Sequence, residues 1–575
     1  MMFCIAAATA FAGCTDQTTA QDTGKAAAKS PTFNPATVSI TEKTVPIYFG
    51  VVEEVQNVSV YFINGGEIPY VSLEEFMNVL MKVVQEDAEN YTLTFKADGD
   101  KAWFVRENGY SADFDFADNT IHFMDLDMFQ KNPNGALVDG MGMSDTVAPL
   151  YQKDDMLSYE RYGREITKNL NDYGIRMVHK GDGYYMPLQT FSDLFLAGKC
   201  CCCVYNGEAV FLTGTNLSDD LSKIYYSAPK TERTPEIAEF DYNELCMALD
   251  HHYGLKEIHQ IKDFDTLFTE SGYDVYLKGT NQTIADAALF RVVNAHLGDL
   301  HSGFNGVSFR TDPDAFNDEV SGMSVSLAAL GHLEKANELE KVRNKYYPNG
   351  IPHYEEVGNT AYITFDHFVD EGCEDYYSAP KADELDNTIR LMQYAYDQIT
   401  RKGSPIENVV MDLSLNEGGT VYTSVYVTGL FLGEGQISLF DELTGALASA
   451  HYKLDTNRDH VFDKKDTLAG KGYNFYCIES GVSFSCGNLV PNVFKNSERV
   501  TLIGQTSGGG SCVVQPLSTS AGTLFQVSGN TRMSFIKNGA FYDIDRGAET
   551  DIYIRDFSVV YDRQRLTDYI NNKII

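Results

Sequence analysis

The sequence is short of positive charge, of long apolar runs and of cysteines spaced as disulfide partners. Its 575 residues include 45 Lys+Arg against 81 Asp+Glu, a formal net charge of −36, which excludes the basic surface that nucleic-acid binding requires. Beyond residue 14 no stretch reaches the roughly 18 uninterrupted apolar residues of a membrane-spanning helix. Four of the eleven cysteines are consecutive, at 200–203, and neighbours in sequence rarely meet disulfide geometry. The sequence therefore predicts no disulfide scaffold.

Hydrophobic residues are nevertheless abundant, at 43% of the chain with 12% aromatic residues, which is ample for packed cores. A chain of this length is too long for one core and predicts roughly three or four units of common domain size. We expect an α/β (α+β) multidomain fold. Its expected parts are a leader over 1–14, a tether over 15–44, a β-rich domain over 45–215, a helical segment over 225–350 and an alternating strand–helix core over 351–575.

The first residues, "MMFCIAAATAFAGC", form a short apolar run that ends in Cys14. The run is too short to span a bilayer and resembles the end of a bacterial signal peptide with a lipobox, in which the cysteine becomes the lipidated first residue. The following Thr/Ala/Gln/Asp-rich stretch is typical of a flexible tether. This resemblance implies an extracytoplasmic protein at a bacterial cell surface, which meets the membrane only through a lipid anchor. The alternative is a frayed hydrophobic terminus.

Residues 45–215 alternate or cluster β-branched and aromatic residues between Gly, Asn and Asp turns, as in "TVPIYFG" and "YTLTFKADG". The pattern resembles the small stalk domain at the N-terminus of copper amine oxidases. The resemblance implies no copper chemistry here, because no His cluster accompanies it. We expect a spacer or a ligand-presenting module.

Helical patterns begin after residue 225, and one of them, "NQTIADAALFRVVNAHLGDLHSGF" (281–304), ends in a Gly-containing turn that carries His301. From about residue 350 strands and helices alternate: "TAYITFDHF", then "ELDNTIRLMQYAYDQIT", then "IENVVMDLSLNEGG". This order indicates an open α/β layer. Ligands are then expected outside the carboxyl ends of the strands.

Two stretches of the core carry a family resemblance. "NVVMDLSLNEGGTV" (408–421) resembles the strand and Asn-x-Gly-Gly turn of tail-specific, or C-terminal-processing, serine peptidases. "YCIESGVSFSCGNLVPNVFKNSERVTLIGQTSGGG" resembles their nucleophile turn, the helix behind it and the next strand end. The match covers roughly 225–575, in family order. It implies a crotonase-like ββα core that hydrolyses peptide or protein substrates through an acyl-enzyme, with no cofactor required for catalysis.

The resemblance places the nucleophile at Ser485, which opens a helix; Ser483 is its rival two residues earlier. A helix N-terminus offers a partial positive charge and free N–H groups to a developing oxyanion. The N–H of Cys486 is the expected first donor. The backbone of Gly418 or Gly419 is the expected second, because glycine permits close approach to a substrate.

A nucleophilic serine needs a base. The Lys that many family members use would fall on Gly510 or Ser511, neither of which accepts a proton at neutral pH. The tricorn-like branch of the family uses a His, and "LGDLHSGF" matches its position with His301, whose ordinary pKa suits general-base work. A lone His at a helix end is otherwise most often structural.

A carboxylate that orients the His is expected near the C-terminus, in "YDIDRGAETDIYI". The tricorn-like pattern places a Glu there, and Glu549 is the only Glu of this segment. Asp545 is the second choice.

An acidic stretch, "DTNRDHVFDKKD", lies apart from these motifs and follows the spacing of an EF-hand calcium loop. His460 replaces the usual Gly and an Asp ends the loop in place of Glu, so an ordinary acidic loop is an equal alternative. A bound calcium would be structural. The expected ligands are Asp455, Asn457, Asp459, Asp463 and Asp466.

These motifs together predict a secreted, surface-anchored serine endopeptidase. The absent Lys leaves a second class open, a catalytically silent relative that binds peptide or glycan as a surface lipoprotein. A mainly structural envelope lipoprotein is a third.

Overall fold

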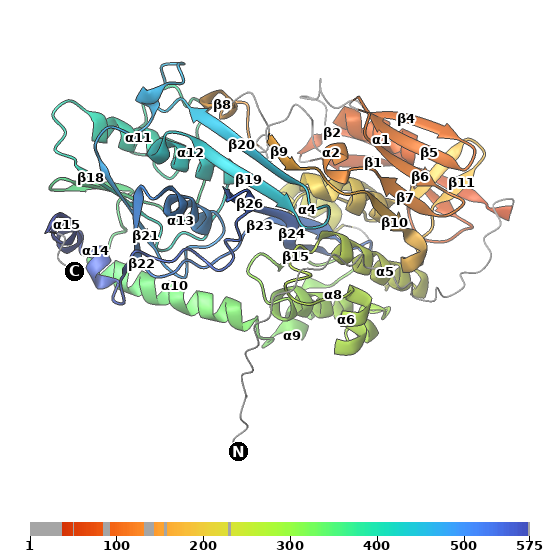
Figure 1. The fold of residues 1–575 in the computed structure, drawn as a ribbon. Helices are drawn as coiled ribbons and strands as arrows, with labels where there is room; N and C mark the ends of the chain where they lie inside the picture. Colours follow the sequence, from red (N-terminus) through yellow and green to blue (C-terminus); the bar gives the residue numbers. More distant parts are fainter. Residues whose placement is uncertain are drawn as a thin grey trace, which may run out of the picture.

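A computed structural model describes residues 37–49, 51–83, 93–107, 109–130, 143–153, 158–227 and 232–572 (Figure 1). The predicted leader and its Cys14 lie outside these residues, as does most of the predicted tether. None of the described helices is long and apolar enough to cross a membrane.

The N-terminal part contains two mainly antiparallel sheets, as the strand patterns predict. Their strands are β1 (Ile40–Phe49), β2 (Val51–Ile63), β3 (Tyr70–Ser72), β4 (Leu93–Asp98), β5 (Lys101–Arg106), β6 (Ser111–Asp115), β7 (Thr120–Phe123), β10 (Ile166–Asn169), β11 (Val178–Lys180), β12 (Gly183–Pro187), β13 (Cys202–Tyr205) and β14 (Val210–Thr213). One sheet has the order β11-β12-β3-β2-β1-β14-β13 and the other β10-β7-β6-β5-β4. The helix α1 (Leu73–Val83) contributes Phe76 and Leu80 to a hydrophobic cluster that includes strands of both sheets.

The helical segment follows with α4 (Asp219–Tyr225), α5 (Pro235–His252), α6 (Phe264–Ser271), α7 (Asp274–Leu277), α8 (Gln282–Arg291) and α9 (Pro313–Val320). The start of α5 has Pro at its first turn and is capped by Thr234, whose hydroxyl accepts from the N–H of Ile237. Asn281 caps α8 in the same way. A π-helical turn over Val292–His296 follows α8 and leads into the loop that holds His301.

The core is a three-layer arrangement around a six-stranded sheet of order β16-β17-β18-β21-β22-β27. Its strands are β16 (Tyr354–Val357), β17 (Thr360–Thr364), β18 (Asn408–Asp412), β21 (Asn474–Glu479), β22 (Val500–Gly504) and β27 (Ile552–Tyr553). All are parallel except β16 at the edge. The covering helices are α10 (Leu327–Tyr346), α11 (Thr388–Thr400), α12 (Val421–Leu432), α13 (Cys486–Ser497), α14 (Ser558–Tyr561) and α15 (Arg563–Asn572).

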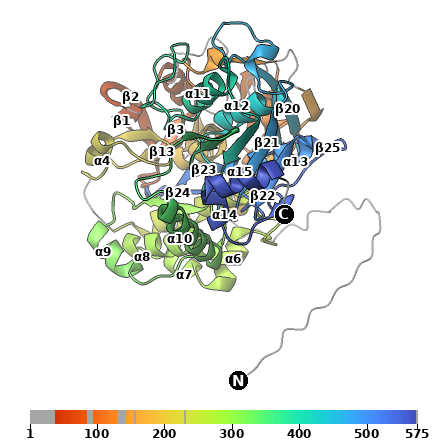
Figure 2. The same cartoon turned by 90° about the vertical axis from the view of Figure 1, so that its left-hand side faces the viewer.

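Both faces of this sheet are buried, and successive residues of a strand point to opposite sides. Val409 and Met411 pack with α11, α12 and α13, whereas Val410 packs with α10, α14 and α15. Figure 2 shows α10, α14 and α15 on one side of the strands and α11 and α12 on the other. The near-continuous apolar run "NVVM" is therefore the pattern of a strand that is buried on both faces.

A second core sheet joins segments that lie far apart in the chain. Its strands are β8 (Tyr151–Lys153), β9 (Ser158–Arg161), β15 (Gly303–Gly306), β19 (Gly435–Asp441), β20 (Leu447–Leu454), β23 (Cys512–Ser518) and β24 (Leu524–Ser534). Both β8 and β9 pair with β20, so part of the segment predicted over 45–215 belongs to the core. Pairing between strands so far apart in the sequence leaves no local pattern. The predicted boundary at residue 215 therefore does not separate the N-terminal part from the core, because strands from before it pair with β20.

Candidate active site

The candidate site lies where the parallel strands of the core end. The segments 413–419, 480–485 and 505–511 directly follow β18, β21 and β22, and hydrogen bonds join them. The Phe484 N–H donates to the Asn416 carbonyl (3.0 Å), and the Ser485 N–H donates to the Gly509 carbonyl (2.9 Å). The segments therefore lie at the carboxyl ends of the strands, the position at which open α/β sheets bind ligands.

Ser485 has a backbone conformation that L-residues rarely adopt. Its φ is 55° and its ψ −122° at the residue that precedes α13, and its hydroxyl makes no capping hydrogen bond to the helix. The side chain is half-buried. Non-glycine residues in such conformations cost free energy and cluster at functional sites, where the surrounding structure holds them. The strained turn places the Ser485 hydroxyl at a helix N-terminus without a capping hydrogen bond to the helix.

The Asn-x-Gly-Gly turn lies directly against this serine. A Cβ on Gly418 would meet the Ser485 Cβ at 2.6 Å, so only glycine fits there. Asn416 fixes the turn, because its Nδ2 donates to the Phe365 carbonyl (3.0 Å) and its Oδ1 accepts the Gly418 N–H (3.0 Å). The Gly419 N–H makes no hydrogen bond to another described residue. Of the two glycines, Gly419 is therefore the one with a free donor.

Cys486 is fully buried at the first position of α13, where a helix leaves its N–H groups without intrahelical partners. Within the described chain its N–H donates no hydrogen bond. Its thiol donates to the Gly419 carbonyl at 3.2 Å, which joins the two candidate donor segments. Burial raises the pKa of this thiol to about 12, so the thiol itself is not a nucleophile at neutral pH.

Ser483 differs from Ser485 in both burial and bonding. Its side chain is fully buried. Its hydroxyl donates to the Leu413 carbonyl (2.7 Å) and accepts the Ser480 N–H (2.9 Å). These bonds tie the nucleophile turn to the end of β18, a structural use of the hydroxyl.

The turn that carries His301 is organised by Asp299. One carboxylate oxygen of Asp299 accepts the N–H groups of His301 (3.1 Å) and Ser302 (2.8 Å). Its other oxygen accepts the hydroxyls of Ser302 (2.8 Å) and Tyr253 (2.9 Å). Asp299 thus fixes the backbone of the turn that holds His301. In the sequence, the Asp two positions before the His is the feature that could have predicted this turn.

The His301 side chain is 7% exposed and lies beside the nucleophile turn. Its ring centroid is 4.7 Å from that of Phe484, the residue before Ser485. The ring makes no hydrogen bond to Ser485 in the structure. Burial lowers the pKa of His301 to about 4, although the negative charges of Asp299 and Asp545 act in the opposite direction. The imidazole is therefore neutral at pH 7 and able to accept a proton.

Of the two carboxylates considered for orienting His301, Asp545 is the one whose charge acts on its imidazole. The Asp545 carboxylate accepts the Ser511 N–H (2.6 Å) and hydroxyl (3.0 Å). Glu549 is exposed and makes no hydrogen bond or ion pair with another described residue. The preference for Glu549 rested on the tricorn-like pattern and on its being the only Glu of the segment, whereas the position of a carboxylate depends on how the C-terminal loop folds back.

A second histidine borders the site and was not predicted from the sequence. His332, on α10, has its Nε2 3.1 Å from the Glu417 carboxylate, and its ring centroid is 6.1 Å from that of Phe484. Glu417 directly precedes Gly418. Nothing near His332 in the sequence marks it, since α10 reaches the site only through tertiary packing.

The acidic loop predicted to bind calcium follows β20. Carboxylate oxygens of Asp455, Asp459 and Asp466 lie within 4.8 Å of one another. His460, at the position of the usual Gly, adopts the left-handed conformation of that turn (φ 61°). Asp463 instead caps a short turn and accepts the Lys465 N–H (2.6 Å), and the Asn457 Oδ1 accepts the Asp459 N–H (2.8 Å). The structure thus brings three of the five expected ligands together.

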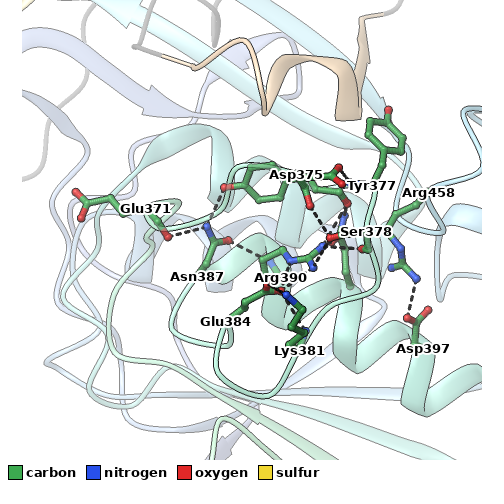
Figure 3. Close-up of polar contacts among 12 residues, drawn as sticks. Glu371, Asp375, Tyr377, Ser378, Lys381, Glu384, Asn387, Arg390, Asp397 and Arg458 are labelled. Carbon is green, nitrogen blue, oxygen red and sulfur yellow. Dashed lines mark hydrogen bonds and ion pairs between the residues drawn. The ribbon is translucent and has the colours of Figure 1, made fainter.

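A separate cavity of about 740 Å³ lies against the loop between β17 and α11. Under it the buried Arg390 donates to Glu384 (2.6 and 2.9 Å) and to the Ser378 carbonyl (2.9 Å), as Figure 3 shows. Asn387 donates to the Glu371 carbonyl (3.1 Å) in the same view. No predicted catalytic residue lines this cavity, so it is not the site described above.

Comparisons with solved structures give similar but remote folds. The photosystem II D1 C-terminal processing protease is 17% identical (TM-score 0.26), and the alignment covers 34% of this chain and 42% of that one. A putative peptidase from Parabacteroides merdae is 13% identical (TM-score 0.40), over 59% of this chain and 97% of that one. Mature CPAF complexed with lactacystin is 11% identical (TM-score 0.37), over 59% and 99%. A search of curated proteins finds no match.

The family comparison is more specific. Residues 359–554 match the model of peptidase family S41, and this range includes both the Asn-x-Gly-Gly turn and Ser485. His301 lies before it. Residues 359–554 are therefore similar to the serine-type peptidases of family S41, as the motifs predict.

Proposed function

We propose that the protein is a serine endopeptidase in which Ser485 is the nucleophile and His301 the general base. The observation that carries the proposal is the strained backbone of Ser485 at the start of α13, with Gly418 against its side chain. Covalent labelling with a fluorophosphonate probe, followed by peptide mapping, tests it.

In the proposed reaction the Ser485 hydroxyl attacks the scissile carbonyl of a peptide and His301 takes its proton. The amide N–H groups of Cys486 and Gly419 stabilise the oxyanion that forms, as fixed donors do in a site of low dielectric. His301 then protonates the leaving amine, and water attack on the acyl-enzyme repeats these steps in reverse. Asp299 and Asp545, in place of Glu549, are the carboxylates whose charges favour the imidazolium formed on the way.

His301 must approach Ser485 for this transfer, since the two side chains are not hydrogen-bonded in the structure. Catalytic hydrogen bonds are often long without substrate and tighten in the substrate complex. The His301 ring already contacts the ring of Phe484, the residue directly before Ser485. This contact supports a mechanism in which His301 moves only a short way to reach the Ser485 hydroxyl.

We also propose that Cys14 carries lipid and anchors the protein outside the cytoplasm. Cells fed a fatty-acid analogue should label the wild type and leave Cys14→Ala unlabelled, because the thiol is the attachment point. The matched control is Cys200→Ala, an exposed cysteine of the folded part, which should keep the label. Equal labelling of wild type and Cys14→Ala would contradict the anchor.

The acidic loop is proposed to bind a structural calcium ion. Burial and the charges of Asp455 and Asp459 raise the pKa of Asp466, and a divalent cation would relieve that repulsion. A ligand that binds only the folded state stabilises it by about 2.7 kcal/mol at a hundred times its Kd. The temperature of thermal unfolding should therefore rise by roughly 5–11 °C at that calcium concentration, at roughly 2–4 °C per kcal/mol.

The shift should disappear in Asp455→Asn plus Asp459→Asn. It should persist in Glu374→Gln plus Asp383→Asn, which removes two exposed acids elsewhere. An identical melting temperature of the wild type with calcium and with chelator would make the loop an ordinary acidic turn.

A further inference from the structure

Arg532 is a buried cation beside the candidate site that no motif explains. It lies on β24, is 6% exposed and donates to three carboxylates. Its Nη1 donates to Glu442 (2.8 Å), and its Nη2 donates to Asp543 (2.5 Å) and Asp545 (2.6 Å). Its Nε donates to the Ser511 hydroxyl at 2.7 Å. All three nitrogens of the guanidinium thus donate to residues of this cluster.

The cluster is joined to the backbone behind Ser485. The Ser511 N–H and hydroxyl both donate to Asp545. Two residues earlier, the Gly509 carbonyl accepts the Ser485 N–H at 2.9 Å. A Cβ on Gly509 would lie 2.3 Å from the Asp545 carbonyl oxygen, so the strand end and the C-terminal loop are in direct backbone contact. A shift of Asp545 would move the backbone that supports the nucleophile.

We propose that Arg532 is a positioning residue of this site, which fixes the Asp545 carboxylate and the Ser511 hydroxyl behind Ser485 and offsets the Asp545 charge at His301. The inference rests on the proposed function of Ser485 and His301. Arg532 itself transfers no proton, because a guanidinium stays protonated in proteins.

The charged groups that face His301 can be named from each element around it. Asp299 lies on its own turn and Asp545 on the C-terminal loop, and His332 of α10 lies across Phe484. Removing Arg532 leaves the Asp545 charge without its partner, which favours the imidazolium form of His301. Removing the Asp545 charge does the opposite. The two substitutions therefore shift the His301 titration in opposite directions, which loss of folding alone does not produce.

The experiment is an NMR titration of the full-length protein labelled with ¹³C-histidine, with the His301 resonance assigned from His301→Gln. Arg532→Met should raise the His301 midpoint by roughly 0.5–1 pH unit, and Asp545→Asn should keep His301 neutral to lower pH than in the wild type. Arg532→Lys, which keeps the charge, should leave the midpoint near the wild-type value. Arg499→Met, which removes an exposed arginine bonded to the Leu432 carbonyl, should also leave it unchanged.

A midpoint that is the same in the wild type, Arg532→Met and Asp545→Asn would overturn the proposal. If Arg532→Met does not fold, a midpoint in Asp545→Asn at or above the wild-type value overturns it as well. The titration needs no activity. A wild-type protein that titrates as expected and yet never reacts with a serine-directed probe would count against the peptidase mechanism and not against the role of Arg532.

Discussion

A fluorophosphonate probe should label the folded wild-type protein at one residue, Ser485. The reason is local: its hydroxyl is half-buried and uncapped at a helix N-terminus, next to the free N–H of Cys486. Labelling should vanish in Ser485→Ala. Ser483→Ala should still be labelled at Ser485, because the Ser483 hydroxyl is already bonded to the chain on both sides.

The same assay distinguishes the two histidines of the site. Removing a general base costs roughly 10²–10⁴-fold in rate, and this is the loss expected of His301→Gln. His332→Gln is the matched control, a His of the same site whose Nε2 faces Glu417, and it should cost much less. A large loss in His332→Gln with little in His301→Gln would reassign the base.

The pH dependence of labelling of the wild-type protein tests the protonation of His301. Only neutral His301 accepts a proton, so the rate should rise with pH through its pKa and then level off. Burial lowers that pKa to about 4, so the rise should be complete by about pH 5–6, whereas an unperturbed imidazole would give a midpoint near ~6.5. A midpoint at 6.5 or above would mean that His301 is more exposed in the reacting enzyme.

Failure of the probe to label the protein at any pH would count against the peptidase mechanism. A folded wild-type protein with no labelling and no peptide cleavage would favour a catalytically silent relative that binds peptide or glycan. Labelling that maps to Ser483 would move the nucleophile by two residues.

The largest expected effect on stability comes from Arg563→Met. The Arg563 guanidinium, on α15, donates to Asp412 (2.7 Å) at the end of β18, and both side chains are at most 3% exposed. Breaking a buried pair by removing one partner costs about 3–5 kcal/mol, because the remaining charge stays buried without compensation. Denaturant unfolding should show this loss. Arg565→Met, an exposed arginine on the same helix, should change stability by less than about 0.5 kcal/mol.

The double variant Arg563→Met plus Asp412→Asn separates the unpaired charge from the lost packing. It removes the buried charge together with its partner, so it should be more stable than Arg563→Met alone. A double variant as unstable as the single one would attribute the loss to the packing of Arg563 over the Tyr362 ring, 4.5 Å away. The pair matters for the site because β18 leads directly into the Asn-x-Gly-Gly turn.

Much of the fold was predictable because its signals are local. The strand at 408–412 is apolar at every position but its ends, and α11 follows an Asn cap with apolar residues at helical spacing. The order of these elements predicted an α/β layer with its site at the strand ends. The pairing of β8 and β9 with β20 was not predictable, because the partners are nearly 300 residues apart and no local pattern specifies such a register.

The sequence by itself pointed to the candidate nucleophile, the candidate base and the glycine turn, because each lies in a short motif that resembles the pattern of one peptidase family. Only the tertiary structure decided what surrounds them. It brought the Asp545 charge to bear on His301, placed His332 and Arg532 beside the site, and buried His301 deeply enough to lower its pKa. These are contacts between distant segments, and burial and charge at a site depend on everything that packs against it.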